Sequence, residues 1–85
     1  MTVGKRFFVM HLPEDEPSRR EGYVYGVQIL NAKGEGDLEG YLRADDTHLE
    51  IVGYVVPRPV IDAARRQENG QGDYVDEEGR RLPPF

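Results

Sequence analysis

Apolar and polar positions alternate in short runs along the first two thirds of the chain, a pattern typical of β-strands. The segment KRFFVMHL (5–12) is aromatic and β-branched and is stopped by Pro13. YVYGVQILN (23–31), DLEGYLR (37–43) and HLEIVGYVV (48–56) follow, separated by turns rich in glycine and acidic residues. Each run is too short for a stable helix. We therefore predict four strands, the last three joined by short turns as an antiparallel meander.

The pattern changes to a helical period after residue 56. The segment PRPVIDAARRQEN (57–69) begins with prolines, which suit a first helical turn, and Asn69-Gly70 supplies a stop signal. Residues 69–73 form a predicted flexible joint. The segment YVDEEGRRLPPF (74–85) then alternates around Glu-Glu-Gly, which predicts a C-terminal hairpin or strap that completes the core.

These elements predict a single α+β domain spanning residues 1–85. It has an antiparallel sheet of about four strands, one short helix after the fourth strand and the C-terminal hairpin. The alternative is a small five-stranded β-barrel with the helix as a plug or flap. The chain has no cysteine, so packing and backbone pairing must hold the fold. The charged segment 13–22 is too long for a tight hairpin and is predicted to be a mobile loop.

Charge is concentrated in the middle of the chain. Residues 21–56 hold seven acidic side chains against Lys33 and Arg43, so this segment supplies the whole formal net charge of −5. A phosphate backbone would be repelled there, and we expect no direct binding of nucleic acid. No run approaches the roughly 18 apolar residues of a membrane helix, and no secretory signal is evident. We predict a soluble protein of a reducing, bacterial-type cytoplasm, without membrane contact.

Motifs for chemistry are weak in this chain. The segment GEGDLEG (34–40) lacks the third glycine and the lysine of phosphate loops, and its carboxylates would repel phosphate. His11 and His48 could meet across the sheet, but their separation in sequence is no ligand motif. The single serine, Ser18, is in no nucleophile motif. We predict no catalytic residue, no cofactor and no metal.

Tyrosines are the more informative signal. The helix is expected to cover the sheet face that carries Leu38, Leu42, Leu49, Ile51 and Val55, and one short helix then leaves the second sheet face uncovered. If Val24 and Leu30 of the second strand point inward, the second face carries Tyr23, Tyr25, Tyr41, Val52 and Tyr54. The C-terminal segment, a second copy of the chain or a protein partner must then cover it. Because tyrosine is favoured at interfaces, we predict that this tyrosine-rich face binds a protein partner or forms a homodimer.

Three classes of function follow from this pattern. The first is a small interaction or regulatory module that acts through the tyrosine-rich face or a sheet edge. The second is an acidic mimic of nucleic acid that occupies a DNA-binding protein, which would require the acids to line one face at phosphate-like intervals. The third is an enzyme or small-ligand binder, although a chain of 85 residues has little room to enclose a pocket. The first class fits the residues best.

Overall fold

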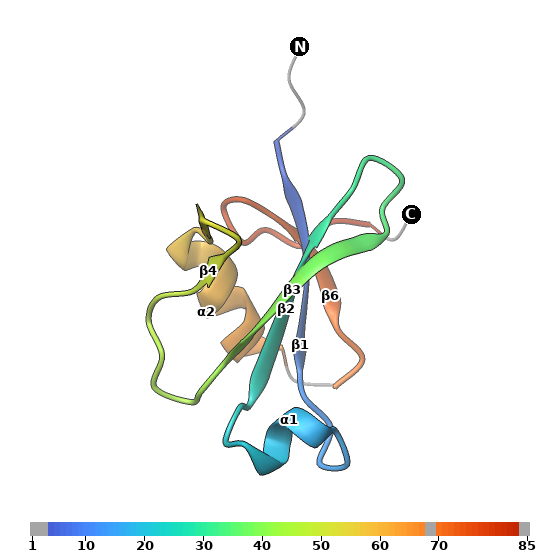
Figure 1. The fold of residues 1–85 in the computed structure, drawn as a ribbon. Helices are drawn as coiled ribbons and strands as arrows, with labels where there is room; N and C mark the ends of the chain where they lie inside the picture. Colours follow the sequence, from blue (N-terminus) through green and yellow to red (C-terminus); the bar gives the residue numbers. More distant parts are fainter. Residues whose placement is uncertain (1–3, 68–69, 84–85) are drawn as a thin grey trace.

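A four-stranded antiparallel sheet forms the centre of the computed structural model, which describes residues 4–67 and 70–83 (Figure 1). Its strands are β1 (Arg6–His11), β2 (Tyr25–Leu30), β3 (Gly36–Leu42) and β6 (Asp73–Asp76), in the order β3-β2-β1-β6. The predicted α+β class is confirmed. The sheet is open, so the barrel alternative is wrong.

The first strand lies inside the sheet, as its two apolar faces predict. Phe7 is opposite Ile29 on β2 and Val75 on β6, and Val9 is opposite Val27. These side chains share one face of the sheet because cross-strand partners point to the same side. All five are buried, and they form the sheet side of the core.

Helix α2 (Arg58–Arg66) covers that face and confirms the predicted helix. It follows Pro57 and has a second proline in its first turn. Backbone N–H groups in a first turn have no hydrogen-bond partner within the helix, so a proline there removes no helical hydrogen bond. Val60, Ile61 and Ala64 are buried against the sheet at helical spacing. A helix this short persists only through such packing. Asn69, part of the predicted stop signal, lies outside the described residues.

The segment 48–56 differs from its prediction as a fourth sheet strand. It folds back as a separate two-stranded hairpin, with β4 (Glu50–Ile51) paired to β5 (Tyr54–Val55). Val52 and Gly53 between them have positive φ angles of 48° and 78°, which reverse the chain. Ile51 and Tyr54 therefore share the inner side. Val55, which was predicted to point inward, is 54% exposed, while Val56 is buried.

The hairpin packs on the same side of the sheet as α2. Leu49, Ile51 and Val56 belong to the core cluster with the residues of α2. A side chain at Gly40 of β3 would place its Cβ 3.0 Å from both Leu49 and Ile51. The glycine therefore provides the space in which the hairpin meets the sheet.

The predicted C-terminal hairpin is confirmed as far as Pro83, since residues 84–85 lie outside the described residues, and it also supplies the fourth sheet strand. Val75 bridges Arg81, and the backbone N–H of Leu82 donates to the carbonyl of Tyr74 at 2.7 Å. The turn closes where the Asp76 carboxylate accepts from the N–H of Arg80 at 2.9 Å. On its other side β6 pairs with β1. The end of the described chain is thus an integral part of the sheet.

The charged segment 13–22 is not a loop throughout, because it contains one turn of helix, α1 (Pro17–Arg20). Pro17 favours the start of this turn, and Ser18 is buried within it. The predicted mobility of this segment and of the joint at 69–73 stays a prediction. No helix in the described part of the chain is long and apolar enough to cross a membrane.

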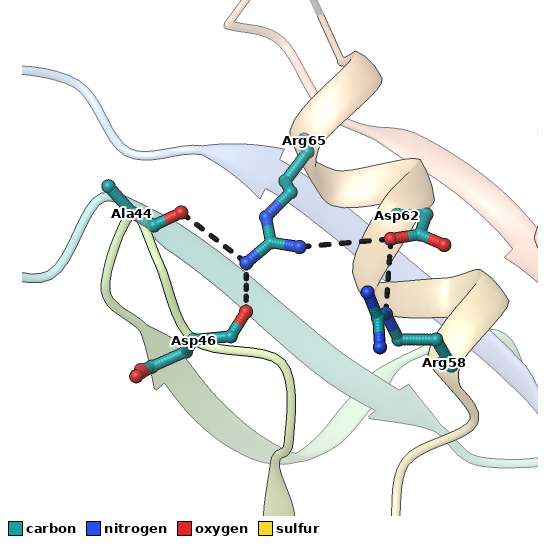
Figure 2. A network of polar contacts seen from close by, with 5 residues as sticks. All are labelled: Ala44, Asp46, Arg58, Asp62 and Arg65. Atoms are coloured by element: carbon teal, nitrogen blue, oxygen red, sulfur yellow. Dashed lines mark hydrogen bonds and ion pairs between the residues drawn. The ribbon is translucent and has the colours of Figure 1, made fainter.

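Arg65 fastens α2 to the connection between β3 and β4 (Figure 2). Its guanidinium donates to the backbone carbonyls of Ala44, at 3.3 Å, and of Asp46. On the helix it lies 3.8 Å from the carboxylate of Asp62, which also pairs with Arg58 at 3.4 Å. A planar guanidinium suits this double role because it presents several donors in fixed directions.

Candidate protein-interaction face

The sheet has a second face, which carries a cluster of large apolar side chains. Helix α2 and the β4-β5 hairpin both pack on the face of Phe7 and Val9, as the core cluster shows. The alternate residues of the same strands point the other way. We call this side the open face and define it by six side chains: Phe8, Met10, Gln28, Glu39, Tyr41 and Tyr74.

Aromatic rings dominate the open face. Phe8 and Tyr74 lie on neighbouring strands with ring centroids 5.0 Å apart. Tyr41 contacts the ring of Tyr23 at 5.8 Å, near α1. All four rings are half-buried. Gly72 allows the Phe8 ring to lie against the backbone, since a Cβ there would be only 2.1 Å from its Cζ.

A hollow of about 220 Å³ lies in the open face. Its apolar lining includes Phe8, Met10, Leu12 and Tyr41, and the carboxylates of Glu16 and Glu39 stand beside them. Gly26 lies between these groups. A Cβ at this glycine would be 3.3 Å from Leu12, 3.7 Å from Met10 and 3.9 Å from Tyr41. The missing side chain therefore deepens the hollow.

The carboxylates of Glu39 and Glu16 act on the hydroxyl of Tyr41 and affect its pKa. Hydrogen bonding with the Ser18 side chain lowers the pKa of Tyr41. Partial burial and the carboxylates of Glu39 and Glu16 outweigh this effect and raise the pKa above its ordinary value. Negative charge on Tyr41 is thus disfavoured.

The structure divides the five residues predicted as one tyrosine-rich face. Tyr23 and Tyr41 do lie together by the open face. Tyr25 and Tyr54 instead pack against the core on the side of α2, where Tyr54 stacks on Phe7 with a centroid distance of 6.4 Å. Val52 is at the tip of the β4-β5 hairpin and is 83% exposed.

The physical reason for this division is the register of β2. Pairing of Val9 with Val27 places Val27 and Ile29 under α2, and Tyr25 shares their face. The register expected from sequence, with Val24 and Leu30 inward, is the opposite one. A single-residue change of register moves every side chain to the other face. The turn at Val52-Gly53 pairs Tyr54 with Ile51 and thereby places Tyr54 on the inner side of the hairpin.

Five of the six residues that define the open face were not among the predicted site residues: Phe8, Met10, Gln28, Glu39 and Tyr74. The sequence contained a signal for two of them, because both faces of the first strand are apolar. Tyr74 joins them through the pairing of β6 with β1, which brings the two ends of the described chain together.

The two histidines and a second hollow are the other candidate sites, and each is a weaker candidate than the open face. His11 lies against the Tyr25 ring at 5.3 Å, whereas His48 is 3.8 Å from the carboxylate of Glu50. Among the described residues no group of three or more His, Cys, Asp or Glu side chains could hold a metal ion. A hollow near residues 76–80 is lined by charged groups, of which Arg80 and Glu78 already form an ion pair.

No protein family, curated protein or solved structure matches this chain, so no function is carried over from a relative.

Proposed function

We propose that this chain is a small protein-interaction module that binds a protein partner through the open face. One observation carries the proposal: Phe8, Met10, Tyr41 and Tyr74 gather on the sheet face opposite the core. Apolar side chains gathered in this way are typical of interaction surfaces. Tyrosine and phenylalanine contribute strongly to such surfaces because they bury a large area and lose few rotamers.

The shape of the face supports a protein surface rather than a small-molecule site. Its hollow has a volume of 220 Å³, below the range of roughly 300–1,000 Å³ that is usual for ligand pockets. The acidic groups in its lining, Glu16 and Glu39, disfavour a nucleic-acid backbone. An aromatic surface with a small hollow fits a partner that contributes projecting side chains.

The partner we propose is a different chain rather than a second copy. A second copy joined through the same face would bring its own Glu16 and Glu39 to the interface. Opposed like charges weaken such pairing and favour a partner of complementary charge.

The proposal is tested by capture from the native cell followed by binding measurements with the purified captured protein. Tyr41→Ser and Phe8→Ser each remove an aromatic anchor. We expect each change to weaken binding by a factor of about 30, the loss typical of an interface hot spot. Val55→Ser is the matched control, because Val55 is 54% exposed but lies on the β4-β5 hairpin; we expect it to bind normally.

A variant that removes no packing keeps the test independent of stability. Gln28→Arg adds a long charged side chain to the middle of the open face, beside Glu39, and should block the partner while the thermal melt stays unchanged. Normal binding by both Gln28→Arg and Tyr41→Ser would refute the proposal.

A further inference from the structure

We infer that a long cationic side chain of the partner, arginine or lysine, occupies the hollow of the open face. This inference rests on the proposed function and names the chemistry that the face recognises. Arginine and lysine both combine an apolar stem with a charged end. The lining of the hollow offers apolar groups for the stem and carboxylates for the charged end.

The apolar stem matches the lining of the hollow. Met10 and Phe8 of β1 project from the sheet, and the side chain of Leu12 follows at the end of that strand. Gly26 leaves the space between Leu12 and Tyr41 unfilled. A methylene chain placed there would lose its contact with water and gain contacts with these side chains.

The charged end matches the two carboxylates. Glu16 precedes α1 but makes no capping hydrogen bond with its side chain. Glu39 accepts a hydrogen bond from Gln28 at 3.4 Å, which is long, and also interacts by hydrogen bonding with the hydroxyl of Tyr41. A carboxylate has about four lone-pair sites, so Glu39 can accept from a further donor as well. No lysine or arginine is among the described residues that line the hollow. The negative charge is therefore not neutralised there by a basic side chain of the lining.

An arrangement of the same kind already occurs beside the hollow, within the chain itself. The guanidinium of Arg43 lies over the Tyr23 ring, 4.5 Å from its centroid, and donates to the carbonyl of Glu21 at 2.8 Å. Tyr23 in turn contacts Tyr41. A cation over an aromatic face is attracted by the ring's π electrons. Tyr41, which lines the hollow, offers a second aromatic ring there.

The inference is tested with four short, extended peptides that are identical except at their centre. The central residue is arginine, lysine, citrulline or norleucine; citrulline has nearly the shape of arginine without its charge. Binding is followed by NMR through the backbone amide signals of Gly26, Glu39 and Tyr41. We expect saturable shifts with arginine or lysine, and affinities lower by a factor of about ten with the neutral residues.

Matched variants assign the effect to the hollow. Glu39→Gln and Glu16→Gln each remove one charge and should each weaken binding of the cationic peptides about tenfold. Glu50→Gln makes the same change of net charge on the β4-β5 hairpin and should leave binding unchanged. Gly26→Ala should weaken binding by filling the hollow, and its melt shows whether the added methyl group is accommodated.

The result that overturns the inference is equal binding of the four peptides, or no saturable binding of any. This failure is distinct from failure of the proposed function. If the partner captured from the cell is lost with Tyr41→Ser but binds Glu39→Gln and Glu16→Gln normally, the open face is the interface and the cationic side chain is wrong. If the Tyr41 and Gln28 variants also bind normally, the interface itself is wrong.

Discussion

Val52 combines two features that are unusual for a valine. Its φ of 48° lies in the left-handed region, which β-branched residues rarely adopt, and 83% of its surface is exposed. With Gly53 it forms the two central positions of the β4-β5 turn, where both φ angles are positive. Asparagine followed by glycine is the preferred pair for such a turn. Val52 thus has strain in the folded state and little burial to offset it.

Replacing Val52 by asparagine should therefore stabilise the protein. We expect Val52→Asn to raise the free energy of unfolding by about 1 kcal/mol, because asparagine tolerates a positive φ. Denaturant titration measures the change. Val55→Asn is the control, since Val55 is also exposed but lies in the extended strand β5. Identical changes in the two variants would show that the strain at Val52 has no measurable cost.

At the scale of elements, the short helix α2 and the β4-β5 hairpin depend on contacts with the rest of the protein for their stability. Helix α2 has 9 residues and the β4-β5 hairpin has strands of 2 residues each, lengths that are marginal in isolation. Two features bring them together on the sheet. Gly40 lets the hairpin approach β3 closely, and Arg65 joins α2 to the backbone that leads into the hairpin (Figure 2).

The link through Arg65 gives a prediction at this scale. Arg65→Met keeps most of the apolar stem but leaves the carbonyls of Ala44 and Asp46 without this donor. We expect a loss of about 1–2 kcal/mol in the free energy of unfolding. The neighbouring Arg66 is exposed, so Arg66→Met should change stability little. Equal melting temperatures of Arg65→Met and the unmodified protein would contradict the structural role of Arg65.

At the scale of the whole molecule, the sheet joins segments from opposite ends of the sequence. Strand β1 lies between β2, its neighbour in sequence, and β6, which is far along the chain (Figure 1). Val75 of β6 is 3% exposed and pairs with Phe7. The sheet is therefore complete only when residues near 75 have reached the first strand, and such distant pairing has an entropic cost.

Deleting residues 72–85 should therefore destabilise the domain rather than leave it intact. The deletion exposes the edge of β1 and removes Val75 from the core. A milder form of the same test is Val75→Ala, for which we expect a loss of about 1–3 kcal/mol. Val55→Ala is the exposed control and should have little effect. Coinciding melts of the truncated and full-length chains would contradict the role of β6.

The lining of the open face was only partly predictable from sequence. The alternation in KRFFVMHL places Phe8 and Met10 on a second apolar face, and DLEGYLR places Glu39 and Tyr41 on a common side. Their meeting with Tyr74 depends on strand order, which the alternation does not specify. The assignment of Tyr25 to the same face was wrong because alternation leaves the choice between two faces open until the strand has a partner.

Local patterns by themselves determined three sheet strands, the helix and the C-terminal hairpin. Each is encoded within a few residues, by a period of two, a period near 3.6, or a turn sequence such as Glu-Glu-Gly. The tertiary structure alone decided that 48–56 leaves the sheet, that β6 takes its place beside β1, and which face of β2 is buried. These outcomes depend on contacts between distant residues, such as Gly40 with Ile51 and Val9 with Val27. Each segment allows more than one strand partner and more than one buried face, and the combination that packs best in the whole molecule is the one that forms. The same packing determined which aromatic side chains were left on the open face.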